Sequence, residues 1–343
     1  MHHQAPWRRD MNPWFALALL VLLLLGPLLL APLERNIEWL FLSLGIVAAI
    51  AARRLDPPLI LHALREPWPI SLTVVIAGIL FSRGQATLAG GLGWMAKRVP
   101  RAVLVALLTF LIAILASVVT AIVAALAFAQ LIQLLGLQGV QRRRTAVAGC
   151  FAIALGAALT PLGEPLATLA TSALKLDMLG LMRLLGLYLL PGVLACGLLA
   201  GLCAGRAQEI TSAPARVESL TGNILDGVRI YAFVAGLVLI GAAFAPLAAP
   251  RMATLSPSLL YWGNMISAAA DNATLVAIEL HGLSAARARP ALIALLVSGG
   301  MLIPGNVPNI VCAARLELGS REWARTGIPL GLLLLLAYFV AIG

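Results

Sequence analysis

About ten long apolar runs divide the chain, and they constrain its fold more than any other feature. They are rich in Leu, Ala and Val without strict alternation, which indicates helices rather than barrel strands. Most approach or exceed the ~20 residues that a helix needs to cross a bilayer. The runs cover residues 14–33, 37–52, 68–82, 102–137, 146–175, 182–204, 224–249, 255–280, 290–316 and 326–342.

Composition agrees with this pattern. Hydrophobic residues make up 61% of the chain and charged residues only 11%, whereas soluble domains are ~45–50% apolar and ~25% charged. The sequence therefore predicts an all-α polytopic membrane protein whose main partner is the lipid bilayer. It excludes a cytosolic globular enzyme, a disordered chain and a secreted disulfide scaffold.

The formal net charge of +10 does not indicate nucleic-acid binding. The excess lies in short loops such as 141–144, where positive charge sets membrane orientation, and no basic stripe is interleaved with aromatic residues. The run 14–33 lacks a small-residue cleavage site, so we expect a transmembrane helix there instead of a signal peptide. The four cysteines lie in apolar segments without a CxxC motif and are interpreted as small buried hydrophobes.

Three apolar runs are unusual. Residues 102–137 are too long for one crossing and carry Ser117 and Thr120 near their middle, which predicts a hairpin. Proline and glycine interrupt 146–175 and 290–316, and these residues unwind helices. Backbone groups freed inside lipid must be satisfied by protein, water or an ion. The two interruptions are therefore expected to line a site.

The unusual runs recur in the same order, which predicts two repeats. The interrupted texts, 158–165 and 301–308, also resemble each other, with Pro165 opposite Pro308. Such paired interruptions are typical of secondary transporters. The positive-inside tendency places both ends of the first hairpin on the cytoplasmic side, and the second hairpin would then enter from the other side. This arrangement predicts inverted repeats. The expected organisation is N-terminal transmembrane helices in 1–69, a first repeat in 70–204 with hairpin 102–137 and broken helix 146–175, a connecting loop in 205–223, and a second repeat in 224–343 with hairpin 255–280 and broken helix 290–316.

The N-terminal topology stays open, because Arg53, Arg54 and Arg65 would face outside if 68–82 crossed fully while 83–101 lay in the cytoplasm.

Two of the acidic residues lie within predicted membrane segments, away from the helix ends. Most others, Glu66 among them, lie at helix ends and are interpreted as solvated, but Glu164 lies in a broken helix and Asp271 at the second hairpin. A carboxylate in a membrane segment is costly unless it is paired, protonated or bound to a cation, and no Arg or Lys lies close to either acid along its segment. A helix cap is the alternative for Asp271, and a carboxylate that reaches the interface at a kink is the alternative for Glu164. Glu279 and His281, at the end of their run, are interpreted as a solvated pair.

Neutral oxygen donors surround these acids in the sequence. Hard cations such as Na⁺ bind carboxylate, amide, hydroxyl and unwound carbonyl oxygens, whereas an anion site would be expected to use an Arg. We therefore expect Na⁺ or H⁺ at Asp271, Glu164 and Asn306. Further expected ligands are the side chains of Asn272, Thr274, Asn309, Thr120 and Thr160, and the loop backbones around Gly163, Pro165, Gly305 and Pro308.

The texts 158–170, Asp271-Asn272 and 304–310 resemble the ion transporter superfamily of sodium/proton antiporters, arsenite pumps and dicarboxylate carriers. The resemblance is closest to a bacterial family of predicted cation transporters of unknown function, and covers about residues 70–343. It implies inverted repeats, ion binding between hairpin tips and broken loops, and a place in the bacterial cytoplasmic membrane. Relatives are often homodimers, so a homodimer is an open possibility. Here the first hairpin tip lacks the acid or amide of many relatives, and Glu164 stands where they often carry Thr.

These observations together predict a secondary active transporter that exchanges Na⁺ or another small inorganic cation for H⁺, with Asp271 and Glu164 alternately holding the two ions. No resident cofactor is expected. A carrier of an anion, a dicarboxylate or arsenite is the alternative, although an extra carboxylate disfavours a dianion. An intramembrane enzyme is the alternative of another class; it is not expected, because the sequence contains no HExxH and no second Asp in a GxGD context.

Overall fold

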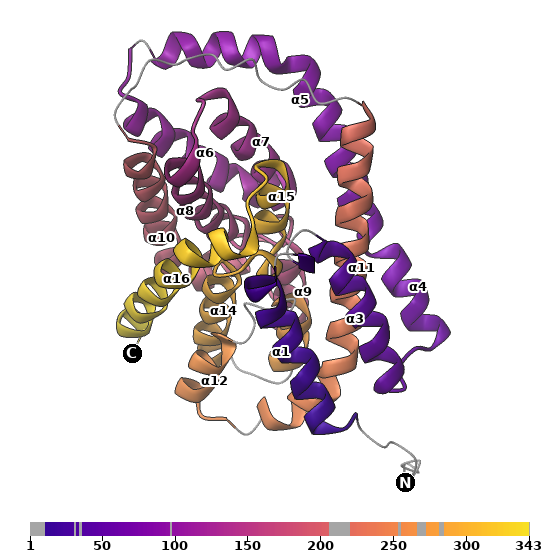
Figure 1. The fold of residues 1–343 in the computed structure, drawn as a ribbon. Helices are drawn as coiled ribbons and strands as arrows, with labels where there is room; N and C mark the ends of the chain where they lie inside the picture. The colour runs from indigo at the N-terminus through magenta and orange to yellow at the C-terminus, as the bar shows by residue number, and fades with distance from the viewer. Residues whose placement is uncertain are drawn as a thin grey trace.

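The computed structural model describes residues 11–30, 32–33, 36–96, 98–205, 220–252, 255–265, 272–280 and 285–342, and within them all regular structure is helical (Figure 1). This confirms the predicted all-α fold. The N-terminal helices are α1 (Pro13–Leu29), α3 (Ile37–Ala51) and α4 (Pro57–Arg65). They are followed by α5 (Pro67–Ala96), α6 (Arg101–Val119), α7 (Ala121–Leu134), α8 (Gly139–Ala157), α9 (Pro165–Ala173) and α10 (Gly180–Ala204). The remaining elements are α11 (Leu220–Met252), α12 (Pro257–Gly263), α13 (Asn272–Glu279), α14 (Ala285–Gly299), the short 3₁₀ turn η2 (Ile303–Gly305), α15 (Val307–Arg315) and α16 (Ser320–Ile342).

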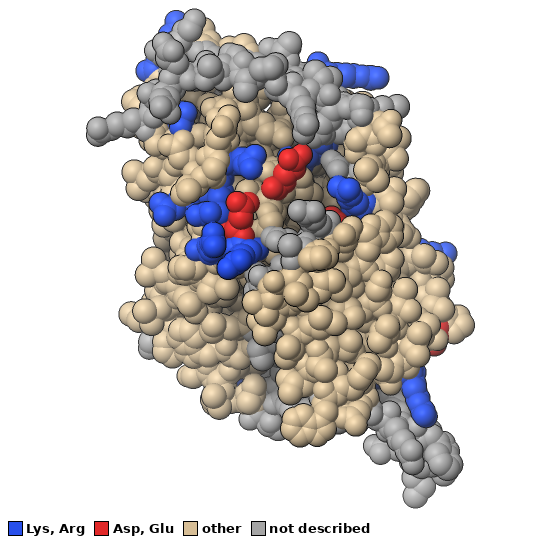
Figure 2. Space-filling view, viewed as in Figure 1, with Lys and Arg blue, Asp and Glu red and all other residues tan. Residues whose placement is uncertain are grey.

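The outer surface is suited to lipid. Five described helical stretches are long and apolar enough to cross a membrane: Pro57–Ile76, Arg101–Val119, Gly180–Ala204, Gly227–Phe244 and Ser320–Ile342. On α10, Leu187, Leu194 and Leu202 are exposed, while the opposite face is buried. Charged side chains on the face in Figure 2 gather near the α15–α16 junction, and uncharged atoms cover most of the rest. Large apolar side chains exposed in this way require an apolar solvent.

The order of elements occurs twice along the chain. A long helix (α5 or α11) precedes two helices, which we call the first hairpin (α6 and α7) and the second hairpin (α12 and α13). A helix that ends at a break (α8 or α14), a nine-residue helix after it (α9 or α15) and a long last helix (α10 or α16) then follow. The two series also interlock, because α7 packs on α15 and α13 packs on α9. Each hairpin therefore contacts the broken helix of the other series. The opposite orientation of the series and the re-entry of the hairpins stay predictions.

Helix α5 differs from the sequence expectation. The apolar run was expected to end at residue 82, with 83–101 as a loop, but the helix continues to Ala96 and its end crosses the top of Figure 1. No proline lies between Pro69 and Pro100, so glycines alone interrupt this stretch, and they weaken a helix without breaking it. Most of the expected connecting loop, residues 206–219, lies outside the described residues.

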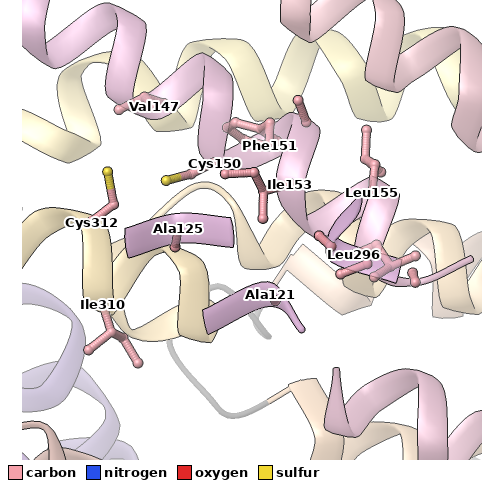
Figure 3. Close-up of a cluster of buried hydrophobic side chains, with 14 of the residues drawn as sticks. Ala121, Ala125, Val147, Cys150, Phe151, Ile153, Leu155, Leu296, Ile310 and Cys312 are labelled. Atoms are coloured by element: carbon pink, nitrogen blue, oxygen red, sulfur yellow. The ribbon is translucent and has the colours of Figure 1, made fainter. Parts of the chain in front are cut away.

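Helix α8 is the centre of the packing. Residues 145–157 are buried on all sides, as expected for a helix without a lipid-facing stripe. Figure 3 shows Cys150, Phe151 and Ile153 of α8 among side chains from α7, α14 and α15. Cys150 and Cys312 are fully buried in this cluster, which agrees with their interpretation as small buried hydrophobes. The break that follows α8 is thus held by a rigid core.

Glycine sets the distance between α3 and α11. A Cβ on Gly236 would lie 2.5 Å from the Leu42 nitrogen, and one on Gly45 would lie 2.6 Å from the Gly236 carbonyl oxygen. Phe41 and Phe233 stack beside this contact with ring centroids 4.8 Å apart. Small residues allow close helix contact in membranes, where lipid supplies no hydrophobic drive for association. Helix α3 therefore packs directly on the backbone of α11.

Gly236→Ala is expected to destabilise the purified protein by about 1–3 kcal/mol, because the new methyl group must displace the α3 backbone. The measurement is the thermal unfolding midpoint in detergent. Gly90→Ala on α5 is the matched control, because its Cβ would meet nothing within 4 Å; it should unfold at or above the wild-type midpoint. Equal midpoints for the two variants would contradict the close contact.

Candidate functional site

One cavity of about 840 Å³ lies where the first hairpin meets the first break. Its walls come from α4 and α5, the turn between α6 and α7, the loop before α9 and α9 itself, two positions on α11 and one on α15. The polar residues that line it are His62, Arg65, Glu66, Thr73, Thr120, Glu164 and Thr168. The sequence predicted Thr120, Gly163, Glu164 and Pro165 as site residues, and all of them line this cavity.

Thr120 forms the whole turn of the first hairpin. Helix α6 ends at Val119 and α7 begins at Ala121, so the chain reverses at a residue with φ of 117° and ψ of 150°. This region of backbone conformation is essentially restricted to glycine and costs about 1–3 kcal/mol for other residues. The Thr120 hydroxyl oxygen is buried and has no hydrogen-bond partner. A strained turn thus holds a polar oxygen at the cavity.

Hydrogen bonds tie this turn to the first break. The Ala121 amide donates to the Gly163 carbonyl over 2.8 Å, and the Thr160 hydroxyl donates to the Ser117 carbonyl. A Cβ on Gly163 would overlap the Ala157 carbonyl, so only glycine fits here. These contacts satisfy backbone groups that the break frees. The Thr160 hydroxyl thus has a structural role at this junction, and its predicted role as a cation ligand stays a prediction.

Glu164 occupies the N-cap position of α9, immediately before Pro165, and is only 8% exposed. Its side chain makes no capping hydrogen bond to α9, although the Thr168 amide donates to the Glu164 backbone carbonyl over 3.2 Å. The positive end of the α9 dipole favours negative charge at this position. The carboxylate is therefore at the cavity without a role in capping the helix.

The second break has a matching local geometry. Asn306 is the N-cap of α15 with φ of −156° and ψ of 161°, against −156° and 158° for Glu164. The N-caps thus place Glu164 opposite Asn306, one residue away from the register given by the prolines. The Asn306 Oδ1 accepts from the Asn309 amide over 3.0 Å. Val307 lines the cavity, but Asn306 does not. A cation site shared by Glu164 and Asn306 was predicted, and the described cavity does not join them.

Asn309 and Asn272 hold the second break together. The buried Asn309 Nδ2 donates to the carbonyls of Gly299 and Leu302, both over 2.8 Å. Asn272 Nδ2 donates to the Leu295 carbonyl over 2.9 Å, and a Cβ on Gly299 would overlap this amide and come within 2.8 Å of the Gly305 carbonyl oxygen. The predicted site residues Asn272, Gly305, Pro308 and Asn309 are therefore buried in packing. Asp271 and the Thr274 side chain lie outside the described residues.

Sequence reasoning missed a charged stripe on α4 and α5. His62, Arg65, Glu66 and Thr73 line the cavity, and His62 Nδ1 lies 3.8 Å from Glu66 Oε2. Glu66 was interpreted as a solvated helix end; it is exposed, but toward this cavity. The lack of Arg or Lys near Glu164 holds only along the sequence, because Arg65 lines the same cavity. The spacing of 62, 65, 66, 69 and 73, typical of one helix face, could have revealed the stripe.

Glu279 is also placed differently from its interpretation as solvated. It is 7% exposed, and Asn264 Nδ2 donates to its Oε2 over 3.0 Å. The amide partner lies on the other arm of the hairpin, fifteen residues earlier, and packing against α14 removes both groups from solvent. Glu279 does not line the cavity.

The cavity can hold a small cation or a proton. It combines the Glu164 carboxylate with neutral oxygens from Thr120, Thr168 and the Gly163 carbonyl, the ligand types of hard cations. Among the described residues, no group of three His, Cys, Asp or Glu could bind a transition metal.

Comparison with known proteins gives a family. The family model described as "Protein of unknown function (DUF1646)" matches residues 14–343. No curated protein matches the chain. The match confirms the expectation of a family of unknown function and extends it over the N-terminal helices. The wider resemblance to the ion transporter superfamily rests on the sequence motifs alone.

Replacement of Thr120 tests the strain at the hairpin turn. Thr120→Gly should be more stable than Thr120→Ala by about 1–3 kcal/mol, because both lose the hydroxyl and only glycine adopts the positive φ without strain. Denaturation of the two purified variants measures the difference. At Thr73, inside α5, the same pair of substitutions should give the opposite order. A Thr120→Gly variant less stable than Thr120→Ala would show that the turn is not strained.

Proposed function

We propose that this chain, which belongs to the DUF1646 family, is a secondary active transporter that exchanges a small cation, in the first instance Na⁺, for H⁺. The observation that carries the proposal is the buried Glu164 carboxylate at a cavity built from a hairpin turn and a helix break. A buried carboxylate in a membrane segment marks an ion pathway more often than a structural feature. The paired breaks agree with the architecture of secondary transporters.

The cavity residues have distinct roles in this proposal. Glu164 holds either the proton or the cation, and competition for one carboxylate couples the two fluxes. The Thr120 hydroxyl supplies a neutral ligand, since its oxygen has no other partner. The Gly163 carbonyl accepts one bond from Ala121 and keeps a second lone pair for the cation. The cavity would open alternately to the two sides of a bacterial cytoplasmic membrane.

Glu164→Gln should abolish cation-dependent proton movement in liposomes loaded with a pH gradient. Removal of a charged ligand costs about 1.5–3 kcal/mol, so we expect a loss of about tenfold or more in the flux at fixed cation concentration. Glu322→Gln is the matched control, because Glu322 is exposed on the first turn of α16 and does not line the cavity. Asp271→Asn, measured in the same assay, tests the role that the sequence predicts for Asp271.

The flux assay uses Na⁺, Li⁺ and K⁺ in turn on the wild-type protein and each variant. Equal dissipation of the gradient by wild type and Glu164→Gln for every cation would reject Glu164 as the exchange site.

A second candidate function is transport of an anion, and Arg65 favours it. Its guanidinium group belongs to the cavity lining, beside His62 on the same helix face. Anion sites commonly use Arg, which binds carboxylates and related oxyanions through its planar fork. In this alternative Glu164 would not contact the substrate.

Arg65→Gln separates the two functions. Exchange of cations for H⁺ should remain within about threefold of wild type, because the interaction of one exposed charge typically contributes less than ~1 kcal/mol. Anion transport would instead require Arg65, and labelled dicarboxylate or arsenite uptake would fall in this variant while Glu164→Gln kept it. Arg83→Gln, an exposed position on α5 outside the cavity lining, is the matched control. Anion uptake that is lost in Arg65→Gln and kept in Glu164→Gln would identify an anion, and not a cation, as the substrate.

A further inference from the structure

A second buried carboxylate lies away from the cavity, inside the second hairpin. Glu279 ends α13, and Asn264 directly follows α12. Asn264 is fully buried, and its Nδ2 donates to Glu279 Oε2 over 3.0 Å and to the Ala291 carbonyl over 3.4 Å. The pair therefore connects both arms of the hairpin with α14.

Two oxygens of this pair have no hydrogen-bond donor. They are Glu279 Oε1 and Asn264 Oδ1, and both are buried. Each orphan acceptor costs about 1–3 kcal/mol, more for a charged group. A buried carboxylate that accepts a single bond from a neutral amide is far from satisfied.

The described side chains of the surrounding elements supply no compensating charge. Helix α13 packs on α9, α11 and α14. The described charged or titratable side chains on these helices are Arg229, Tyr231, Arg287 and Arg289. Arg229 and Arg287 are exposed, Tyr231 donates to the Leu64 carbonyl, and Arg289 contacts Tyr188.

Tyr261 on α12 is also directed elsewhere, because its hydroxyl donates to the Leu335 carbonyl. Glu279 takes no part in the ion pairs His62–Glu66 and Asp177–Arg183, which lie elsewhere in the described part of the chain.

A single proton accounts for both orphan oxygens. A carboxylic acid at Glu279 carries an O–H donor on Oε1, and Asn264 Oδ1 is the neighbouring acceptor that lacks one. The acid and the amide would then exchange two hydrogen bonds, and the buried charge would be removed. Sodium would need several more oxygens than these two.

We propose that Glu279 and Asn264 form a proton-binding site at the base of the second hairpin. A proton taken from water converts the Glu279 carboxylate to the neutral acid and returns to water when the hairpin opens. The site lies about 10 Å along α13 from Asn272, given a rise of ~1.5 Å per residue, so it is at the opposite end of this helix from the second break. A further role, that this proton is one of those exchanged, rests on the proposed function.

Infrared spectroscopy of the purified full-length protein tests the site without reference to transport. At neutral pH, Glu279→Gln should lose one C=O band of a protonated carboxylic acid relative to wild type. The variant should fold, because Gln offers Asn264 the same acceptor and a donor in place of the proton. Glu322→Gln, at an exposed position, should lose a carboxylate band instead and serves as the control.

Two results would overturn the proton site. One is loss of a carboxylate band, and not of an acid band, in Glu279→Gln. The other is a carboxylate band in wild type that shifts when Na⁺ is added and is absent from Glu279→Gln, because this would show that the pair holds a cation.

Exchange in liposomes then tests the coupling role. We expect the cation-dependent proton flux of Glu279→Gln to be about tenfold lower than that of wild type, a ratio that corresponds to about 1.4 kcal/mol. The variant should still bind ²²Na⁺ at equilibrium. Unchanged flux together with a lost acid band would overturn the coupling role. If wild type itself exchanged no cation, the proposed function would fail while the infrared result still decided the proton site.

Discussion

Helix breaks inside an apolar protein release backbone groups that lipid cannot satisfy, and the way these groups are satisfied organises the molecule. At the first break, the hairpin turn supplies the partners: the Ala121 amide donates to Gly163, and Thr160 donates back to Ser117. At the second, one buried side chain, Asn309, bridges the carbonyls of Gly299 and Leu302. The breaks can persist only because these partners are in place. The cavity at Glu164 lies beside the first of these breaks.

The two series of helices are alike in order but not in chemistry. Matching N-cap positions carry an acid in one series, Glu164, and an amide in the other, Asn306. Their hairpins also differ, but here the acid is in the second series. The first hairpin reverses at Thr120, whereas the second contains the Glu279–Asn264 pair. Because α7 packs on α15 and α13 on α9, a movement of either hairpin would also affect the other series. This packing is a physical route by which the two proposed ion sites could be coupled.

The sequence predicted the features that depend on local chemistry. Proline and glycine located both breaks, and a polar residue within an overlong apolar run located the turn at Thr120. It missed features that depend on distant partners. Glu66 was assigned to a helix end and Arg65 was considered only for membrane orientation, because their cavity forms only when α4 and α5 pack near the α9 loop. Glu279 was considered solvated because Asn264 meets it only across the hairpin. The sequence also did not show that the Asn309 amide N–H and the Thr160 hydroxyl donate to backbone carbonyls of the fold; their role as ion ligands through oxygen stays a prediction.

The proposed function depends on competition between a cation and a proton for the buried Glu164 carboxylate. Proton release on cation binding tests it most directly: the purified protein in weakly buffered detergent solution is mixed with Na⁺, Li⁺ or K⁺, and a pH-sensitive dye reports the protons set free. The account predicts saturable release for at least one of these ions, lost when Glu164 is replaced by Gln. No release from the wild-type protein with any of the three ions, at any pH at which it stays folded, would contradict it.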